Sequence, residues 1–255
     1  MDRHKLKSYF SLNESIPWGC PTCKTGSLVI DNTSFYKEIT PESHAICDHY
    51  KQWIPEEISY RYSCLFKCRT CNEVIASSGV GFIDTIGYEV DDDGCHDAIY
   101  GDRFKPKYFE PALILLSIPD KCPESIQEPL KESFKLFFSS LSASANNARI
   151  AIEALLTELN VPKEKLGKKG GLTFMPLHER IGKIPQAYIH VKDMLEAVKW
   201  IGNAGSHHGD VKPQEDDVID IYELIEHVLE EVYEPRLSRL TTIAQRINAS
   251  KGPTK

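Results

Sequence analysis

Two short cysteine pairs constrain the fold of this 255-residue chain more than any other feature of its sequence. The segment WGCPTCKTG contains Cys20 and Cys23, and the segment CRTCN contains Cys68 and Cys71 at the same C-x-x-C spacing. Two such pairs on tight turns can bring four thiolates together in a tetrahedron around one ion, at about 2.3 Å from a zinc. The sequence therefore predicts a closed, structural zinc site whose four ligands all come from the protein.

The two pairs are separated by 44 residues, so a zinc ribbon in this chain must contain an inserted hairpin or loop. Cys64 lies four residues before Cys68 and is an alternative ligand in its place. A second site could use Cys47, His44, His49, Cys95 and His96, although residues scattered over loops are the simpler explanation. Because four thiolates leave zinc no open position for a water, a metallohydrolase built on these cysteines is disfavoured.

Composition and charge argue against several classes of protein. The formal net charge of −7 argues against a chain that coats nucleic acid or an anionic membrane through its overall field, while a local basic patch is compatible with it. The longest apolar run, ALILLSI, is far shorter than the roughly 20 residues of a membrane helix, and the first residues lack the apolar segment of a secretory signal. We expect a cytoplasmic protein with no membrane partner, in which paired cysteines bind metal rather than form disulfides.

The two halves of the chain differ in hydrophobic period. The first half has short alternating runs of the kind typical of strands: GSLVI, EISYRYSCLFKC, NEVIASSGVGFIDTIGYEV and YFEPALILLSI. After PDKCPES the apolar residues recur at helical spacing, as in Leu130, Phe134, Phe137 and Leu141. We predict about five helices there, with GLTFMPLHERIGKI supplying one more.

These patterns predict an α+β fold made of a β-rich half and an all-α half. The β-rich, zinc-ribbon-bearing domain is expected over residues 1–120, and the helical bundle over residues 125–248. The last residues, 249–255, are expected to be a disordered tail.

The segment IGNAGSHHG, residues 201–209, has two interpretations. If the preceding helix continues, Lys199, Asn203 and His207 lie along one side of it at intervals of four residues. Such a line fits metal-free RNA cleavage, with Lys199 on the phosphate, Asn203 orienting it and His207 transferring a proton. In the second interpretation the two glycines end the helix near Ile201, because each costs about 1 kcal/mol in a helix interior relative to alanine.

The second half resembles the HEPN superfamily (higher eukaryotes and prokaryotes nucleotide-binding), in the uncharacterised branch associated with type I restriction subunits. The resemblance covers roughly residues 129–233 and rests on two segments. In ANNARIAIEALL, Arg149 and Glu153 occupy the R-x-x-x-E pattern, and AVKWIGNAGSH matches basic-x-x-G-N-x-x-x-H. Two features depart from the ribonuclease branches, since Lys199 replaces the usual arginine and seven residues separate it from His207.

The resemblance implies a protein of prokaryotic restriction or anti-phage defence systems, with a helical half that forms homodimers. The implied partners are RNA or another nucleic acid and a protein of the defence system. The residues implied for a metal-independent endoribonuclease site at the dimer cleft are His207, Asn203, Lys199, Arg149 and Glu153. The candidate substrate-binding residues are Lys168, Lys169 and His208.

Each of these functional interpretations has a structural alternative. Arg149 and Glu153 are one helical turn apart and could form a surface ion pair worth about 0.2–0.5 kcal/mol. The lysines of VPKEKLGKKGG could belong to a solvated loop. The helical half could also be a non-catalytic dimerisation, partner-binding or nucleic-acid-binding module beside a structural zinc ribbon, and the acidic composition and Lys199 favour this alternative.

Overall fold

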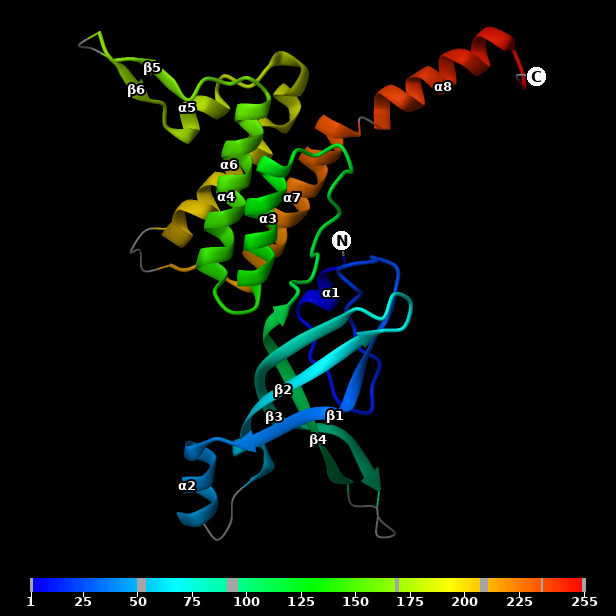
Figure 1. Ribbon diagram of the computed structural model, residues 1–255, viewed down its shortest axis with the longest axis vertical. Coiled ribbons are helices and arrows are strands. Elements are labelled where there is room, and N and C mark those ends of the chain that lie inside the picture. Colours follow the sequence, from blue (N-terminus) through cyan, green and yellow to red (C-terminus); the bar gives the residue numbers. More distant parts are fainter. Residues whose placement is uncertain are drawn as a thin grey trace. The chain divides into compact units, whose positions relative to one another are not determined.

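The computed structural model describes residues 2–49, 54–90, 96–167, 170–206, 211–234 and 236–253 (Figure 1). The chain divides into two compact units. The N-terminal unit comprises Asp2–Ile114 and Phe134–Ser139, and the C-terminal unit comprises Leu115–Ser133 and Ser140–Lys255. No helix in the described ranges is both long and apolar enough to cross a membrane.

An antiparallel sheet of four strands in chain order forms the N-terminal unit. Its strands are β1 (Leu28–Ile39), β2 (Ser59–Cys68), β3 (Val74–Val90) and β4 (His96–Glu110). The helical segments of this unit are α1 (Arg3–Leu6), α2 (Pro41–His49) and the 3-10 turn η1 (Pro55–Glu57). The pairing of β1 with β2 aligns Leu28 with Cys68, so the two cysteine pairs meet at one end of these strands.

An aromatic core lies under one face of this sheet. Alternate residues of β2 are buried, as a half-buried strand requires. The ring of Phe10 meets the rings of Trp18, Tyr62, Phe66 and Phe104 with centroids 5.3–6.1 Å apart, mostly in edge-to-face geometry. Phe10 also exchanges two backbone hydrogen bonds with Phe104, of 2.8 and 3.0 Å.

The last predicted strand, YFEPALILLSI, is misplaced. Strand β4 begins at His96 and ends at Glu110, so only the first three residues of that run belong to it. Gly101 and Pro106 interrupt the pattern of residues that would predict this strand from the sequence. Proline is tolerated in β4 because β4 is an edge strand. After Glu110, Pro111 has no N–H to continue the ladder.

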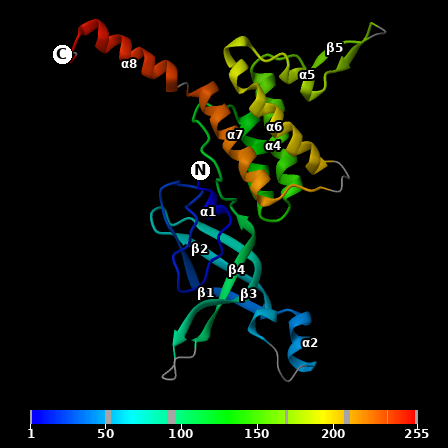
Figure 2. The same cartoon turned by 180° about the vertical axis from the view of Figure 1, so that it is seen from behind.

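Helices dominate the C-terminal half of the chain. They are α3 (Glu124–Phe137), α4 (Leu141–Glu158), α5 (Leu177–Ile181), the 3-10 helix η2 (Gln186–Val191), α6 (Lys192–Ser206), α7 (Glu215–Tyr233) and α8 (Arg236–Ser250). Helices α4, α6 and α7 pack side by side (Figure 2). Their apolar stripes are buried, as Ala148, Val198 and Ile225 illustrate with at most 2% exposure. Helix α8 includes Ala249 and Ser250, so it extends into the expected disordered tail.

The prediction of an α+β fold with an all-α second half requires correction. The fold is mixed, and the helical half also contains an antiparallel hairpin of β5 (Glu164–Leu166) and β6 (Leu172–Phe174). The segment GLTFMPLHERIGKI, expected to be a helix, supplies β6 and only the short α5. A glycine-rich turn explains the difference, since Gly170 has a φ of 81°, which a continuing helix does not permit.

Three buried hydroxyl groups join α4 and α7 to Ser133 in the core of the C-terminal unit. The hydroxyls of Ser133 and Ser144 lie 2.7 and 2.8 Å from that of Tyr222, and Ser133 also donates to the carbonyl of Ser144 at 2.7 Å. All three residues are 0% exposed. Because every member has a partner, this network stabilises the packing rather than penalising it.

We expect Tyr222→Phe to lower the free energy of unfolding by about 1–2 kcal/mol, because both serine hydroxyls lose a buried partner. Urea denaturation monitored by circular dichroism measures this loss. Tyr108→Phe is the matched control, since Tyr108 is 61% exposed. Equal stabilities of the two variants would contradict the role given to the network.

Candidate functional site

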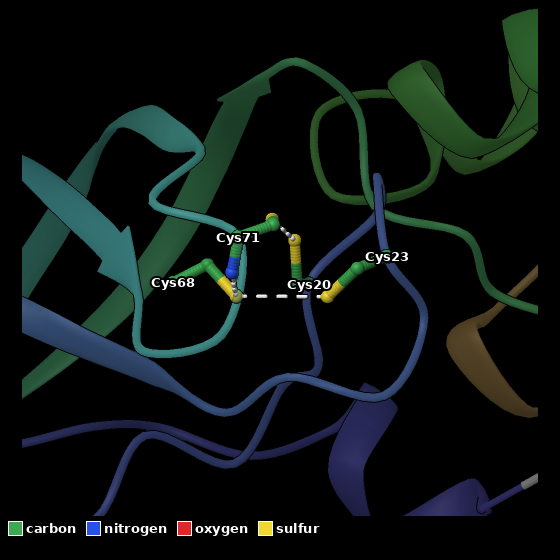
Figure 3. Close-up of side chains that lie close together, drawn as sticks. All are labelled: Cys20, Cys23, Cys68 and Cys71. Carbon is green, nitrogen blue, oxygen red and sulfur yellow. Dashed lines mark hydrogen bonds between the residues drawn. The ribbon is translucent and has the colours of Figure 1, made fainter.

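The four cysteines of the two pairs converge at one point of the N-terminal unit (Figure 3). Their Sγ atoms all lie within 4.8 Å of one another, with 3.6 Å between Cys20 and Cys71 and 3.7 Å between Cys23 and Cys68. A disulfide would need about 2.05 Å, whereas sulfurs tetrahedrally bound to zinc at about 2.3 Å lie about 3.8 Å apart. The cluster could therefore hold a metal ion, and its donor set and spacing fit a tetrahedral thiolate-binding ion.

The two C-x-x-C segments form equivalent turns. In each turn the residue after the second cysteine has a left-handed backbone conformation, with a φ of 60° at Lys24 and 63° at Asn72. The amide of Lys24 donates to the carbonyl of Cys20 at 3.0 Å, and that of Asn72 donates to the carbonyl of Cys68 at 3.1 Å. Each turn thus presents both of its thiols on the same side.

Backbone amides point at two of the sulfurs. The amide of Gly26 donates to Cys23 Sγ at 3.2 Å, and those of Thr70 and Cys71 donate to Cys68 Sγ at 3.4 and 3.5 Å. Desolvation raises the pKa of Cys23, but amide hydrogen bonds outweigh it and lower that pKa to about 6. The Cys71 amide is the main reason that the pKa of Cys68 is also lowered.

The thiol of Cys71 behaves in the opposite way. A hydrogen bond from the Glu73 amide lowers the pKa of Cys71, but desolvation and the neighbouring thiols raise it to about 12. The cluster therefore stabilises the thiolates of Cys23 and Cys68 and resists the ionisation of Cys71. A bound cation would remove that resistance, because it neutralises the added negative charge.

Gly26 is a residue of this site that the sequence analysis did not identify. A Cβ at this position would lie 2.3 Å from Cys68 Sγ and 2.9 Å from Cys23 Sγ, so no side chain fits. Its amide also donates to Cys23. The available signal was the glycine that follows the first pair in CKTG.

The other cysteines that the structure describes, Cys47, Cys64 and Cys122, do not join the cluster. Cys64 points into the core from β2 with 4% exposure, and burial raises its pKa to about 12. Across the ranges that the structure describes, the four paired cysteines are the only group that could hold a metal ion. Cys95, which was an alternative ligand with His96, lies outside the described residues, as does the side chain of His49.

Helix α6 continues through the glycines of IGNAGSHHG as far as Ser206, so the alternative in which it ends near Ile201 is wrong. The glycines allow α4 to approach closely. A Cβ at Gly205 would lie 2.3 Å from the carbonyl oxygen of Ser142, and one at Gly202 would lie 2.5 Å from the Cβ of Arg149. The helix-propensity cost of each glycine is thus offset by a helix contact that only glycine permits.

This helix crossing brings the two halves of the sequence motif together. Arg149 lies against Gly202, which is the residue before Asn203. The guanidinium of Arg149 donates to the carboxylate of Glu153 and, at 3.1 and 3.3 Å, to the side-chain oxygen of Asn146. Arg149 and Glu153 are 22% and 26% exposed and remain in contact with solvent.

Lys199 and Asn203 occupy the same helix but differ in exposure. Lys199 is 6% exposed, and its Nζ lies 3.7 Å from the ring centroid of Trp200. Asn203 is half-buried. Within the described part of the chain, neither side chain hydrogen-bonds to Arg149 or Glu153. The candidates His207, His208, Lys168 and Lys169 lie outside the described residues.

The molecule therefore joins a sheet unit with a four-cysteine cluster to a helical unit with a glycine-mediated helix crossing. Residues 8–109 match the family described as a domain of unknown function (DUF8608), and residues 131–250 match another (DUF4145). Neither the curated proteins nor the solved structures gave a match.

Proposed function

We propose that this chain is a HEPN-like, metal-independent endoribonuclease of prokaryotic defence or restriction systems, whose site lies along α6 at its crossing with α4. The observation that carries the proposal is the contact between Arg149 and Gly202. It joins the R-x-x-x-E and K-x-x-G-N segments, which are 50 residues apart in the sequence, at one helix crossing.

The chemistry follows from the residue types. Cleavage of RNA through its 2′-hydroxyl needs a group that accepts a proton near neutral pH, and histidine is the side chain best suited to this. We assign that role to His207. Arg149 and Lys199 supply positive charge for the phosphate, Asn203 orients it, and Glu153 positions Arg149.

We further propose that the four-cysteine cluster binds zinc and that this zinc is structural. The support is the all-sulfur donor set and the Sγ distances of 3.6 and 3.7 Å. Four protein thiolates complete the tetrahedral coordination of zinc, so no position is left for a substrate or water. In this proposal the protein acts in the cytoplasm as a homodimer formed by its helical half.

We expect His207→Ala to reduce the rate of RNA cleavage by about 10²- to 10⁴-fold, which is the usual contribution of a general acid or base. The assay follows cleavage of total RNA and tRNA without added divalent metal. His178→Ala is the control, because it removes a histidine whose side chain is 62% exposed. A folded, dimeric wild-type protein that cleaves neither RNA would refute the catalytic proposal.

A specific observation favours a second candidate, a non-catalytic binding module. Lys199 is 6% exposed and contacts Trp200, and Arg149 is already paired with Glu153. Cations engaged in this way contribute to packing more readily than to phosphate binding. This candidate predicts that RNA or a defence-system protein is bound without being cleaved, and co-purification followed by the same RNA assay separates it from the first.

A further inference from the structure

A groove of about 590 Å³ lies on the N-terminal sheet. Its residues Ser63 and Leu65 alternate along β2 with Tyr62 and Phe66 of the aromatic core, so the groove is on the opposite face. Small-molecule sites usually have volumes of about 300–1,000 Å³. The groove therefore has the size of a ligand site. It is called here the sheet groove, and its exposed and half-buried lining residues are Ser34, Ser63, Leu65, Ala76, Ser78, Tyr108 and Glu110.

The floor of the sheet groove consists mainly of small residues. Ser63 of β2 pairs with Ser78 of β3. In the next outward-facing row Leu65 pairs with Ala76. Directly opposite residues of an antiparallel pair have Cβ atoms about 4.5–5.5 Å apart, so the two serine hydroxyls lie side by side. Within the described part of the chain neither hydroxyl has a hydrogen-bond partner, and both remain available to a ligand.

A β-bulge makes Tyr108 one wall of the groove. Tyr108 pairs with Ser78. The next pair joins Pro106 to Gly79, so β4 contains an extra residue here. Without that residue Tyr108 would point inward like Pro106, which is buried, but Tyr108 is 61% exposed. Gly79 permits the bulge, because a Cβ there would lie 2.3 Å from the carbonyl oxygen of Lys105.

An irregularity of β1 forms the opposite wall. The register of β1 with β2 shifts between Asp31 and Tyr36, and Ser34 lies in that segment. The amide of Leu65 donates to Ser34 Oγ at 2.8 Å, and Ser34 Oγ donates to the carbonyl of Asp31 at 2.6 Å. These hydrogen bonds fix the segment against the floor. Both walls are thus formed before any ligand binds, as is usual for small-molecule sites.

The unpaired polar groups of the groove define the ligand that fits it. Among the lining residues that the structure describes, only Glu110 is charged, so an anionic ligand would be repelled. A purely aliphatic ligand would deprive the carboxylate and the serine hydroxyls of water without replacing their hydrogen bonds. A neutral flat ring with a hydrogen-bond donor satisfies both conditions, because its face packs on Tyr108 and its donor meets the Glu110 carboxylate.

We propose that the sheet groove binds a nucleobase with an exocyclic amino group, which is adenine, cytosine or guanine. The base stacks on Tyr108, its amino group donates to Glu110, and the hydroxyls of Ser63 and Ser78 bind its polar edge. This inference goes beyond the proposed function, because the groove lies in the N-terminal unit and binds a base whether or not the helical half cleaves RNA. A free nucleoside and an unpaired base of a single strand offer the same chemistry.

Isothermal titration calorimetry of the full chain with the four nucleosides tests this inference. We expect adenosine, cytidine and guanosine to bind at least about 10-fold more tightly than uridine, which lacks the amino donor to a charged acceptor. Equal binding of uridine would overturn the role of Glu110. Binding of none of the four, or of maltotriose in their place, would overturn the nucleobase as ligand.

Oligonucleotides distinguish the two sources of the base. Tighter binding of single-stranded oligoadenylate than of adenosine assigns the groove to unpaired bases of a strand, and tighter binding of adenosine assigns it to a free nucleoside. The His207→Ala variant is used here, so that cleavage does not consume the strand. Since His207 is outside the groove, this variant should bind adenosine like wild type.

Substitutions at one wall and at the floor locate the site. We expect Tyr108→Ala to weaken binding by about 5- to 150-fold, the usual contribution of one base stacked on an aromatic ring, and Tyr108→Phe to bind like wild type. Ser78→Leu should prevent binding by filling the floor. Tyr88→Ala is the matched control, because Tyr88 is 67% exposed on the same sheet but does not line the groove. Undiminished binding by Tyr108→Ala and Ser78→Leu would overturn the inference.

Glu110→Ala tests the selectivity for amino groups. This variant should bind adenosine as weakly as uridine and leave the binding of uridine unchanged. Near-ultraviolet circular dichroism verifies that the variants are folded. RNA cleavage is measured on the same preparations. Absence of cleavage with intact nucleoside binding refutes only the proposed function, and cleavage without nucleoside binding refutes only the ligand of the sheet groove.

Discussion

Replacing Cys20 and Cys23 together by serine is expected to abolish zinc binding and to unfold the N-terminal unit at temperatures where the wild type is folded. Both residues contribute Sγ atoms to the cluster, and two remaining thiols cannot complete a tetrahedral site. Structural zinc contributes about 10–16 kcal/mol to the folding of zinc-finger peptides, and because this unit has its own aromatic core we expect a smaller loss, on the order of 5 kcal/mol.

Two measurements check this prediction. Elemental analysis should give one zinc ion per wild-type chain and none in the double variant, and thermal unfolding should give the loss of stability. Cys47→Ser is the matched control, because Cys47 is a cysteine of the same half outside the cluster. Wild-type protein that is folded and free of metal would contradict the proposed zinc, and retained zinc in the double variant would contradict the ligand set.

Gly205→Ala is expected to destabilise the C-terminal unit by about 2–4 kcal/mol, although alanine is intrinsically the better helix former by about 1 kcal/mol. The new Cβ would lie 2.3 Å from the carbonyl oxygen of Ser142, which is a backbone atom that cannot move aside alone. Helices α4 and α6 must therefore separate. That separation also moves Arg149 away from α6, so the proposed RNA cleavage should fall with stability.

Urea denaturation of the variant measures the change in free energy. Gly182→Ala is the control, since Gly182 has a φ of −63° and a Cβ there would meet its nearest atom at 3.4 Å, an ordinary contact. Stability equal to or greater than wild type in Gly205→Ala would show that helix propensity dominates and that the α4–α6 crossing tolerates a wider spacing.

The sequence predicted regular elements well where one physical signal dominated. In β2, apolar and polar residues alternate except at Leu65, and burial alternates along the strand. In β4, Gly101 and Pro106 interrupt that signal, and only the pairing with β3 reveals the strand. The hairpin of β5 and β6 was missed because its apolar residues, such as Leu172 and Phe174, are exposed rather than buried in a pattern.

The candidate sites were predictable to different degrees for a physical reason. Cysteine spacing is local and specific, so the four-cysteine cluster followed directly from it. The glycines of α6 were interpreted as a possible helix end because their low helix propensity can be read from the local sequence. The close approach of Ser142, which only glycine permits, depends on packing against a segment that is distant in the sequence. The burial of Lys199 likewise depends on neighbours that the helical period alone does not identify.

The alignment of Leu28 with Cys68 gives the cysteine cluster a consequence for the folding pathway of the sheet. A shift of one residue between β1 and β2 would exchange the two faces of a strand, turning core side chains toward solvent. Only the native alignment places Cys68 and Cys71 opposite the turn that precedes β1. Metal capture would therefore select one strand register from the competing ones, so chains that bind the ion early should avoid the misaligned, aggregation-prone intermediates that a metal-free chain can populate.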